Sequence, residues 1–206
     1  MVVYSRRGHG WSPPLTEPRQ VTYMHDEADR VLPALLHELG LERPVLVGHS
    51  DGASIAILYA GAGHEVAGLV LLAPHVFVEE CSVAAIAAVR EAYTTADLPA
   101  RMARHHHDPD ATFHGWNDIW LHPQFRSWNI EARLAAITAP VLLIQGTDDR
   151  YGTLAQLDVI ERGVGGPVER LVIPGVGHAP HLEAPATTRS AVVSFVAALG
   201  RRADQS

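Results

Sequence analysis

The sequence predicts an α/β fold in which helices cover both faces of a mostly parallel sheet. Short apolar runs of strand length alternate with helix-length segments along the 206 residues, an order that indicates parallel strands joined by helices. The runs are apolar at consecutive positions, as in residues 69–73, which is typical of strands buried on both faces. Hydrophobic residues make up 47% of the chain and charged residues 19%, as in an ordinary globular protein.

Five strands are expected, with four helices between and after them. The strands are expected at residues 2–4, 44–47, 68–73, 140–145 and 169–173. The helices are expected at residues 26–39, 53–61, 153–162 and 185–199. Apolar residues recur at helical spacing in the first of these helices, and Gly40 is a natural end for it. Pro33 lies inside this helix and predicts a kink there or a later start.

A long segment separates the first part of this pattern from the last. We expect the core to comprise residues 1–75 and 140–206, and residues 76–139 to form a helical cap. The first part of the cap is rich in alanine, and the second is rich in aromatic side chains, namely Phe113, Trp116, Trp120, Phe125 and Trp128. Because open α/β sheets bind ligands beyond the carboxyl ends of their strands, we expect the cap to cover that edge.

The composition argues against several classes of protein. The net charge is −7 and no basic stripe is visible, which argues against binding to nucleic acid. No apolar stretch approaches the roughly 18 residues that a membrane-spanning helix needs, so no membrane association is expected. Cys81 is the single cysteine and cannot form an internal disulfide. With no signal peptide visible at the amino terminus, a cytoplasmic location is expected.

The strongest chemical signal is the segment Gly48–Gly52, which reads Gly-His-Ser-Asp-Gly and follows an apolar run. Gly-x-Ser-x-Gly between a strand and a helix is typical of a tight turn that strains the serine and lifts its hydroxyl into a cleft. Ser50 is therefore the candidate nucleophile. The backbone N–H of Asp51, at the start of the helix, is the candidate donor to an oxyanion. The alternative is an ordinary glycine-rich turn.

A serine hydroxyl needs a histidine to take its proton and a carboxylate to orient that histidine. Candidates for both follow the later predicted strands, in the order acid and then base that accompanies this serine turn. Asp148 and Asp149 come after the strand at 140–145, and His178 comes after the strand at 169–173. Either aspartate could be the acid.

On these motifs the chain resembles the α/β-hydrolase superfamily over nearly its whole length outside the cap. Four segments carry the resemblance: Arg6–Ser12 (Arg-Arg-Gly-His-Gly-Trp-Ser), Gly48–Gly52, Gly146–Asp149 (Gly-Thr-Asp-Asp) and Gly177–Pro185 (Gly-His-x-x-x-x-Glu-x-Pro). The resemblance implies a nucleophile at Ser50, an acid at Asp149 and a base at His178. Asp148 would then be a turn residue or a partner for Arg150.

The start of the chain departs from the family. Members of the family have three strands before the loop that resembles Arg6–Ser12, and the third ends in a His-Gly turn that supplies a second oxyanion donor. Here Met1 begins one strand before that loop. Either the true start lies upstream or the chain is a naturally short form. In the second case we expect an unpaired sheet edge that favours a homodimer, or weaker catalysis through the lost donor.

Three further residues are candidate substrate contacts. His49 lies beside the serine in the predicted turn, although a packing role is the usual one for such a residue. Trp116 and Trp120 are four residues apart and would share one face of a helix. That face could form the core of the cap or the wall of a substrate pocket.

The other histidines are expected to have simpler roles. His181 would lie at the rim of the cleft or in solvent, and His9 would hold its own loop in place. The run His105–His107 could suggest a metal, but consecutive residues rarely converge on one ion, and structural zinc sites space their ligands differently. We therefore expect a solvated loop there and no metal site.

Together these residues predict a serine hydrolase that acts on a small, partly apolar ester or related carbonyl compound through an acyl-enzyme on Ser50. The only partner implied is a small-molecule substrate, and no cofactor is implied because a serine triad needs none. One alternative is a carbon–carbon bond hydrolase that uses the same triad. The other is a hydrolase-like binding protein without catalytic activity.

Overall fold

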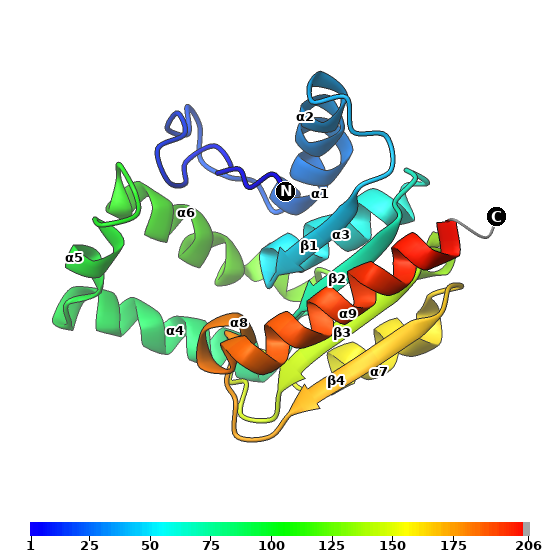
Figure 1. Cartoon of the computed structure of the whole chain (residues 1–206). Coiled ribbons are helices and arrows are strands. Elements are labelled where there is room, and N and C mark those ends of the chain that lie inside the picture. Colours follow the sequence, from blue (N-terminus) through cyan, green and yellow to red (C-terminus); the bar gives the residue numbers. More distant parts are fainter. Residues whose placement is uncertain (204–206) are drawn as a thin grey trace.

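A computed structural model of the chain, which describes residues 1–203, is built around a parallel sheet with helices on both faces (Figure 1). The last three residues of the predicted core segment 140–206 lie outside the described residues. The strands are β1 (Val45–His49), β2 (Gly68–Leu72), β3 (Val141–Gly146) and β4 (Val168–Ile173), hydrogen-bonded in the order β1-β2-β3-β4. Gly48, Leu71, Leu143 and Arg170 lie in register across them. All four strands therefore end at the same edge of the sheet.

Burial along the strands confirms the prediction of a parallel sheet covered on both faces. Every residue of β2 and β3 is buried, whereas β1 and β4, at the two edges, are partly exposed. Consecutive apolar residues were the basis for predicting these strands. The two central strands show why that pattern arises, since each has a neighbour on either side and helices above and below.

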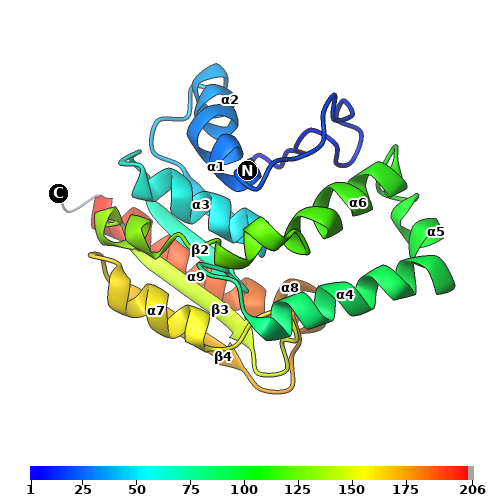
Figure 2. The ribbon, with the colours of Figure 1, turned by 180° about the vertical axis from the view of Figure 1, so that it is seen from behind.

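The two faces of the sheet are covered by different helices, as Figures 1 and 2 show. One face packs against α3 (Asp51–Gly61) and α7 (Ala155–Gly163), and the other packs against α9 (Pro185–Ala203). Strand residues alternate between the two cores: Leu69, Leu71, Val141 and Leu143 belong to the first, and Val70, Leu72, Leu142 and Ile144 to the second. This alternation is the period of two that a strand imposes on its side chains.

The predicted first helix is present but begins earlier and is irregular. It consists of α1 (Tyr23–Asp26), a π-helical turn η1 (Glu27–Val31) and α2 (Leu32–Glu38) in direct succession. The irregular turn lies just before Pro33, whose ring and missing N–H disturb the regular hydrogen-bond ladder. Gly40, at φ 64°, ends the helix as expected.

The strand predicted at residues 2–4 is wrong. Those residues form no strand, and Val2 and Val3 are 55% and 84% exposed. The neighbouring edge of the sheet is β1, which pairs only with β2 among the described residues. A strand is defined by hydrogen bonds to a partner, and a short apolar run has no strand structure where no partner lies beside it. The described sheet accordingly has four strands and not five.

Residues 76–139 contain α4 (Glu80–Thr95), α5 (Leu98–Met102), α6 (Pro109–Trp120) and the short helices η2 (Pro123–Ser127) and η3 (Glu131–Ala136). Figures 1 and 2 show α4 and α6 extending from the side of the sheet where the strands end. The rings of Tyr93 and Phe113 stack between these helices, with centroids 3.8 Å apart. The division into a core and a cap at residues 76 and 139 stays a prediction. No helix among the described residues is long and apolar enough to cross a membrane.

A homodimer through an exposed sheet edge was expected, and strand β1 is one of the two edges of the described sheet. Val47 in the middle of this strand is 60% exposed, and flat apolar edges favour pairing with another chain. The dimer itself stays a prediction.

Val47→Lys should weaken such a dimer, because a lysine on an edge strand opposes pairing. Sedimentation velocity over a range of concentrations should then show a shift from dimer to monomer. Val31→Lys is a matched control, since Val31 is also exposed but lies on the first helix, and it should leave the dimer intact. A wild-type chain that is monomeric at every concentration would contradict the edge dimer.

Candidate active site

Ser50 occupies the turn between β1 and α3, in a strained backbone conformation. Its φ is 53° and its ψ is −121°, a region that residues other than glycine rarely adopt. Its amide donates to the Leu72 carbonyl of the next strand at 2.9 Å. A Cβ on Gly48 would lie 2.3 Å from the Gly52 carbonyl oxygen, so only glycine allows the strand and the helix to approach this closely. The turn has the form that the sequence motif predicts.

Asp51 anchors this turn to two distant helices. Its carboxylate is buried and accepts hydrogen bonds from Tyr23 Oη at 2.5 Å and Trp120 Nε1 at 3.2 Å. Arg6 lies 3.8 Å from the same carboxylate. Burial and the Asp51 charge raise the pKa of Tyr23, so the phenol keeps its proton and donates. The Asp51 side chain thus fixes the first turn of α3, at which its own backbone N–H lies.

His178 and Asp149 are joined by hydrogen bonds between two loops that follow β3 and β4. His178 Nδ1 lies 3.0 Å and 2.9 Å from the two carboxylate oxygens of Asp149. Because an ionised carboxylate only accepts, the proton lies on Nδ1, and Nε2 of His178 is free to accept another proton. Asp149 also accepts from the Tyr151 amide at 2.8 Å and from Gln145 Nε2 at 3.3 Å.

These contacts keep Asp149 charged. Burial raises the pKa of Asp149, but the hydrogen bond and charge of His178 and the amide of Tyr151 outweigh it and lower that pKa overall. The side chain of Asp149 is only 1% exposed. Asp148, in contrast, is exposed, and its carboxylate accepts from the Thr147 hydroxyl at 2.9 Å. Of the two aspartates that the sequence left open, the structure places Asp149 on the histidine.

Glu183 shapes the loop that carries His178. Its carboxylate accepts from the amides of Gly177 at 2.8 Å and Ala179 at 3.0 Å, the two residues that flank the histidine. These two backbone hydrogen bonds lower the pKa of Glu183. The spacing Gly-His-x-x-x-x-Glu in the sequence therefore places a glutamate where it binds the backbone on both sides of His178.

Ser50 and His178 meet at a cavity of about 220 Å³ beyond the strand ends. It is lined by His49, Ser50, His75, Ser82, Ile86, Trp116, Trp120, Tyr151 and His178. The lining therefore comes from the core and from the segment 76–139 together. Ser50 Oγ makes no hydrogen bond within the described part of the chain, which is common in unliganded catalytic sites.

The three candidate substrate contacts all line this cavity. His49 also donates from Nε2 to the His178 carbonyl oxygen at 2.7 Å, so it holds the backbone of that residue. Trp116 is partly exposed, whereas Trp120 is 2% exposed and packs into the main core as well. The two tryptophans therefore form part of the apolar core and part of the cavity wall at the same time. Contact with substrate stays a prediction for all three.

Sequence reasoning missed four residues of the lining. His75 and Tyr151 follow the ends of β2 and β3, so their position at strand ends was a signal that could have found them. Ser82 and Ile86 lie on α4 at helical spacing. No signal in the sequence indicates that this face of the helix points toward Ser50.

The remaining histidines lie away from the cavity or at its border. The segment 105–107 is a loop in which His105 and His107 are exposed, as expected, and His106 Nδ1 also accepts from the Gly10 amide at 3.0 Å, which joins this loop to the amino-terminal one. Arg19 lies 3.0 Å from His9 Nδ1 and ties that loop down. His181 is exposed, with its ring 4.7 Å from that of His49. Among residues 1–203, no group of three His, Cys, Asp or Glu side chains could hold a metal ion.

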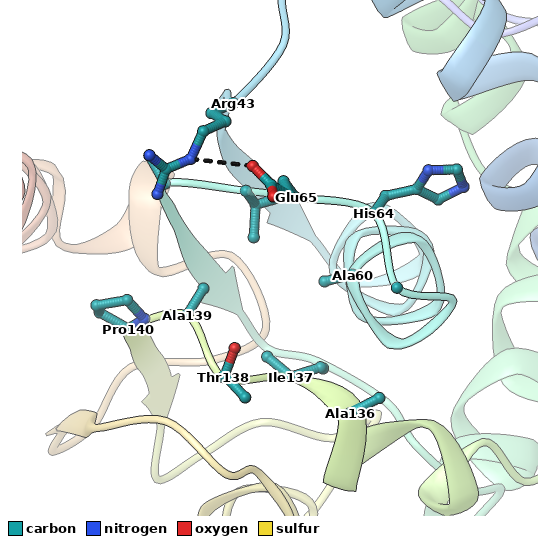
Figure 3. A pocket seen from close by; sticks show the side chains of 12 residues that line it. Arg43, Ala60, His64, Glu65, Ala136, Ile137, Thr138, Ala139 and Pro140 are labelled. Atoms are coloured by element: carbon teal, nitrogen blue, oxygen red, sulfur yellow. Dashed lines mark ion pairs between the residues drawn. The ribbon is translucent and has the colours of Figure 1, made fainter.

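A larger cavity of about 530 Å³ lies at the opposite edge of the sheet (Figure 3). It is formed by the segments that precede β1, β2 and β3, and Arg43 and Glu65 form an ion pair beside it at 3.5 Å. None of its lining residues belongs to the predicted triad, because Ser50, Asp149 and His178 lie at the other end of the strands. The smaller cavity is therefore the candidate active site.

Comparison with known families agrees with this geometry. The model of the Alpha/beta hydrolase family matches residues 1–191, which is nearly the whole chain. The chain belongs to this family. No curated protein matches the chain. Within the α/β-hydrolase fold, the turn at Ser50 has the backbone form expected of a nucleophile elbow, whereas the role of Ser50 and the cap at residues 76–139 stay predictions.

Solved structures show the same fold at low sequence identity. A carboxylesterase structure from the thaumarchaeon Nitrososphaera gargenis is 19% identical with a TM-score of 0.74, covering 97% of this chain and 80% of that one. Proline iminopeptidase from Mycobacterium smegmatis is 21% identical with a TM-score of 0.71, covering 95% and 79%. A thermophilic esterase from Thermogutta terrifontis is 20% identical with a TM-score of 0.67, covering 94% and 78%.

Lowering the pH from about 7 to about 4.5 should destabilise this α/β hydrolase. Burial lowers the pKa of His9, His49 and His75 from 6.5 to about 4. The unfolded chain therefore binds more protons in this window than the folded chain, and the free energy of unfolding falls as the pH falls. Urea titrations followed by circular dichroism measure this, and His9→Gln should remove about one of the protons taken up on unfolding. If the free energy of unfolding depends on pH in His9→Gln as it does in the wild type, the lowered pKa of His9 in the folded chain is wrong.

Proposed function

We propose that the chain is a serine hydrolase that cleaves a small, partly apolar ester or related carbonyl compound through an acyl-enzyme on Ser50. One observation carries the proposal. His178 hydrogen-bonds through Nδ1 to the buried carboxylate of Asp149, at 2.9 Å, and lines the same cavity as the strained Ser50. A histidine oriented in this way beside a serine is the arrangement that activates a hydroxyl.

In the proposed mechanism, Ser50 Oγ attacks the carbonyl carbon while Nε2 of His178 takes the hydroxyl proton. The negative oxygen of the tetrahedral intermediate accepts a hydrogen bond from the Asp51 N–H, at the positive end of α3. Asp149 stabilises the imidazolium that forms. His178 then returns the proton to the departing alcohol, and the acyl group remains on Ser50. Water, deprotonated by His178, attacks the acyl carbon and releases the acid.

The cavity supports a small substrate with an apolar part. Its volume of about 220 Å³ is below the roughly 300–1,000 Å³ of pockets for drug-sized ligands. Ile86, Trp116 and Trp120 give it an apolar wall. Two of the structural neighbours are described as esterases or carboxylesterases, which supports an ester as the first substrate class to test.

Ser50→Ala should abolish hydrolysis of short p-nitrophenyl esters, because the variant has no oxygen to form the acyl-enzyme. A fluorophosphonate probe should label the wild-type chain and not the variant, since only an activated serine reacts. Ser190→Ala is a control that should keep both activities, because Ser190 is exposed on α9 and does not line the cavity. Full esterase activity in Ser50→Ala would overturn the proposal.

Asp149→Asn should lower kcat by about 10⁴-fold, because an amide at this position favours the wrong tautomer of the histidine. Asp148→Asn is the matched control: this neighbour is exposed and does not contact His178, so its kcat should change less than about twofold. Initial rates with p-nitrophenyl butyrate measure both. Equal losses in the two variants would show that Asp149 has no special role.

A further inference from the structure

His75 is a buried histidine at the cavity that the proposed mechanism does not use. It lies three residues beyond the end of β2, after Ala73, whose φ of 45° turns the chain sharply. The Ser54 hydroxyl donates to the His75 carbonyl oxygen at 2.6 Å and fixes its backbone. The side chain lines the same cavity as Ser50 and is 2% exposed.

The ring of His75 is held in place by packing and not by hydrogen bonds. Its centroid lies 5.1 Å from the ring of Trp120 and 5.8 Å from that of His178. The edge of the ring that bears Nδ1 and Cε1 faces Gly152, where an added Cβ would lie 3.1 Å from Cε1. Any side chain at position 152 would therefore press on this ring.

Neither ring nitrogen of His75 has a hydrogen-bond partner within the described part of the chain, and Nδ1 is fully covered. Buried polar side-chain atoms are nearly always paired, because an unpaired one has lost its hydrogen bonds to water without replacing them. Nδ1 faces Gly152 and is out of reach of a ligand. Nε2 is not fully covered, and because the ring lines the cavity, a molecule that enters the cavity can supply its missing partner.

Three other polar side chains of the cavity already have partners, whereas the indole of Trp116 and the phenol of Tyr151, both on partly exposed residues, make no hydrogen bond within the described residues. Ser82 Oγ donates to the Tyr151 carbonyl, and Trp120 Nε1 donates to Asp51. His49 Nε2 donates to the His178 carbonyl. Outside the catalytic pair of Ser50 and His178, His75 is thus a polar group of the wall that is held rigidly and has its hydrogen-bonding capacity unused.

The charge state of His75 decides which ligand it suits. Burial lowers the pKa of His75 to about 4, and the nearby His178 contributes in the same direction. The ring is therefore neutral at pH 7 and offers one N–H donor and one acceptor. Such a group suits an uncharged oxygen function. A carboxylate or a phosphate is bound more strongly by arginine or lysine, whose charge assists the hydrogen bond.

We infer that His75 is a specificity-determining residue that hydrogen-bonds a second oxygen function, a hydroxyl or a carbonyl, carried by the substrate in addition to the reacting carbonyl. The inference rests on the proposed function of the Ser50 site. It narrows the substrate class from small esters in general to hydroxy or oxo esters. A site with a buried group of this kind discriminates against analogues without the oxygen, because binding them leaves the group unpaired.

The test compares esters that differ by a single hydroxyl, since a hydroxyl pairs with either tautomer of a neutral imidazole. One pair, p-nitrophenyl 3-hydroxybutyrate and p-nitrophenyl butyrate, places it on the acyl side. The other pair, 3-hydroxybutyl butyrate and butyl butyrate, places it on the alcohol side. In at least one pair, kcat/KM of the wild type should favour the hydroxylated ester by about tenfold, the size of one net hydrogen bond.

Two variants separate recognition from packing. His75→Leu replaces the ring with an apolar side chain of similar size and should abolish the preference for the hydroxylated ester. His75→Gln keeps a donor and an acceptor and should retain part of that preference. Labelling of Ser50 by a fluorophosphonate probe, which has no second oxygen function of this kind, should persist in both variants, which shows that the serine is still activated. Circular dichroism checks that each variant is folded.

The outcomes distinguish this inference from the function on which it rests. A wild type that is labelled at Ser50 but prefers neither hydroxylated ester would overturn the role of His75 and leave the serine hydrolase intact. Retention of the full preference in folded His75→Leu would overturn it as well. If His75→Leu does not fold, the ratios of kcat/KM for the hydroxylated and plain esters in the wild type and in His75→Gln still test the role of His75. No labelling of Ser50 at all would overturn the proposed function and the inference with it.

Discussion

A side chain at Gly146 would collide with the loop that carries His178, because its Cβ would lie 1.9 Å from the Val176 carbonyl oxygen. This close approach of two backbones is the constraint on which the active site depends. It lets the Asp148 amide donate to Val176 at 2.9 Å, which joins the loop after β3 to the loop after β4. With the two loops joined, Asp149 comes within hydrogen-bond distance of the histidine. Gly48 has the same role for the serine, since the strand and helix that hold it also touch through backbone atoms.

The second support of the site crosses from the core to the helices of residues 76–139. Trp120 of α6 forms a wall of the cavity and donates to Asp51 at 3.2 Å, and Tyr23 of α1 donates to the same carboxylate. The residue after the nucleophile therefore joins three helices. Movement of α6 away from the sheet would remove a buried donor from this carboxylate, and unpaired buried charges are costly. The position of the cavity wall and the geometry of the nucleophile elbow are coupled through one side chain.

The parts of this structure that the sequence predicts are those fixed by local contacts. The elbow depends on backbone approach within a few residues, so the glycine spacing around Ser50 identifies it. In the structure, Asp149 is held by the amide of Tyr151 and the side chain of Gln145. The sequence does not show these contacts, so the prediction of Asp149 over Asp148 came from the family resemblance. The prediction of a strand at residues 2–4 was wrong because apolar composition cannot show whether a partner strand lies beside the segment. The position of His75 just after a predicted strand places it at the correct edge of the sheet, but the sequence does not reveal that the turn after β2 directs its ring into the cavity.

The three histidines that line the cavity illustrate how position assigns chemistry to identical side chains. A histidine can take the proton of Ser50 only if the resulting imidazolium is stabilised. Within the described residues, the ring of His178 hydrogen-bonds the carboxylate of Asp149, and the ring of His49 hydrogen-bonds a backbone carbonyl. The ring of His75 makes no hydrogen bond within that part of the chain. Burial lowers the pKa of both His49 and His75 to about 4, so protonation of either one would be costly at neutral pH. This contrast supports His178 as the proposed base, and it leaves the other two histidines as neutral groups that position the chain or recognise a ligand.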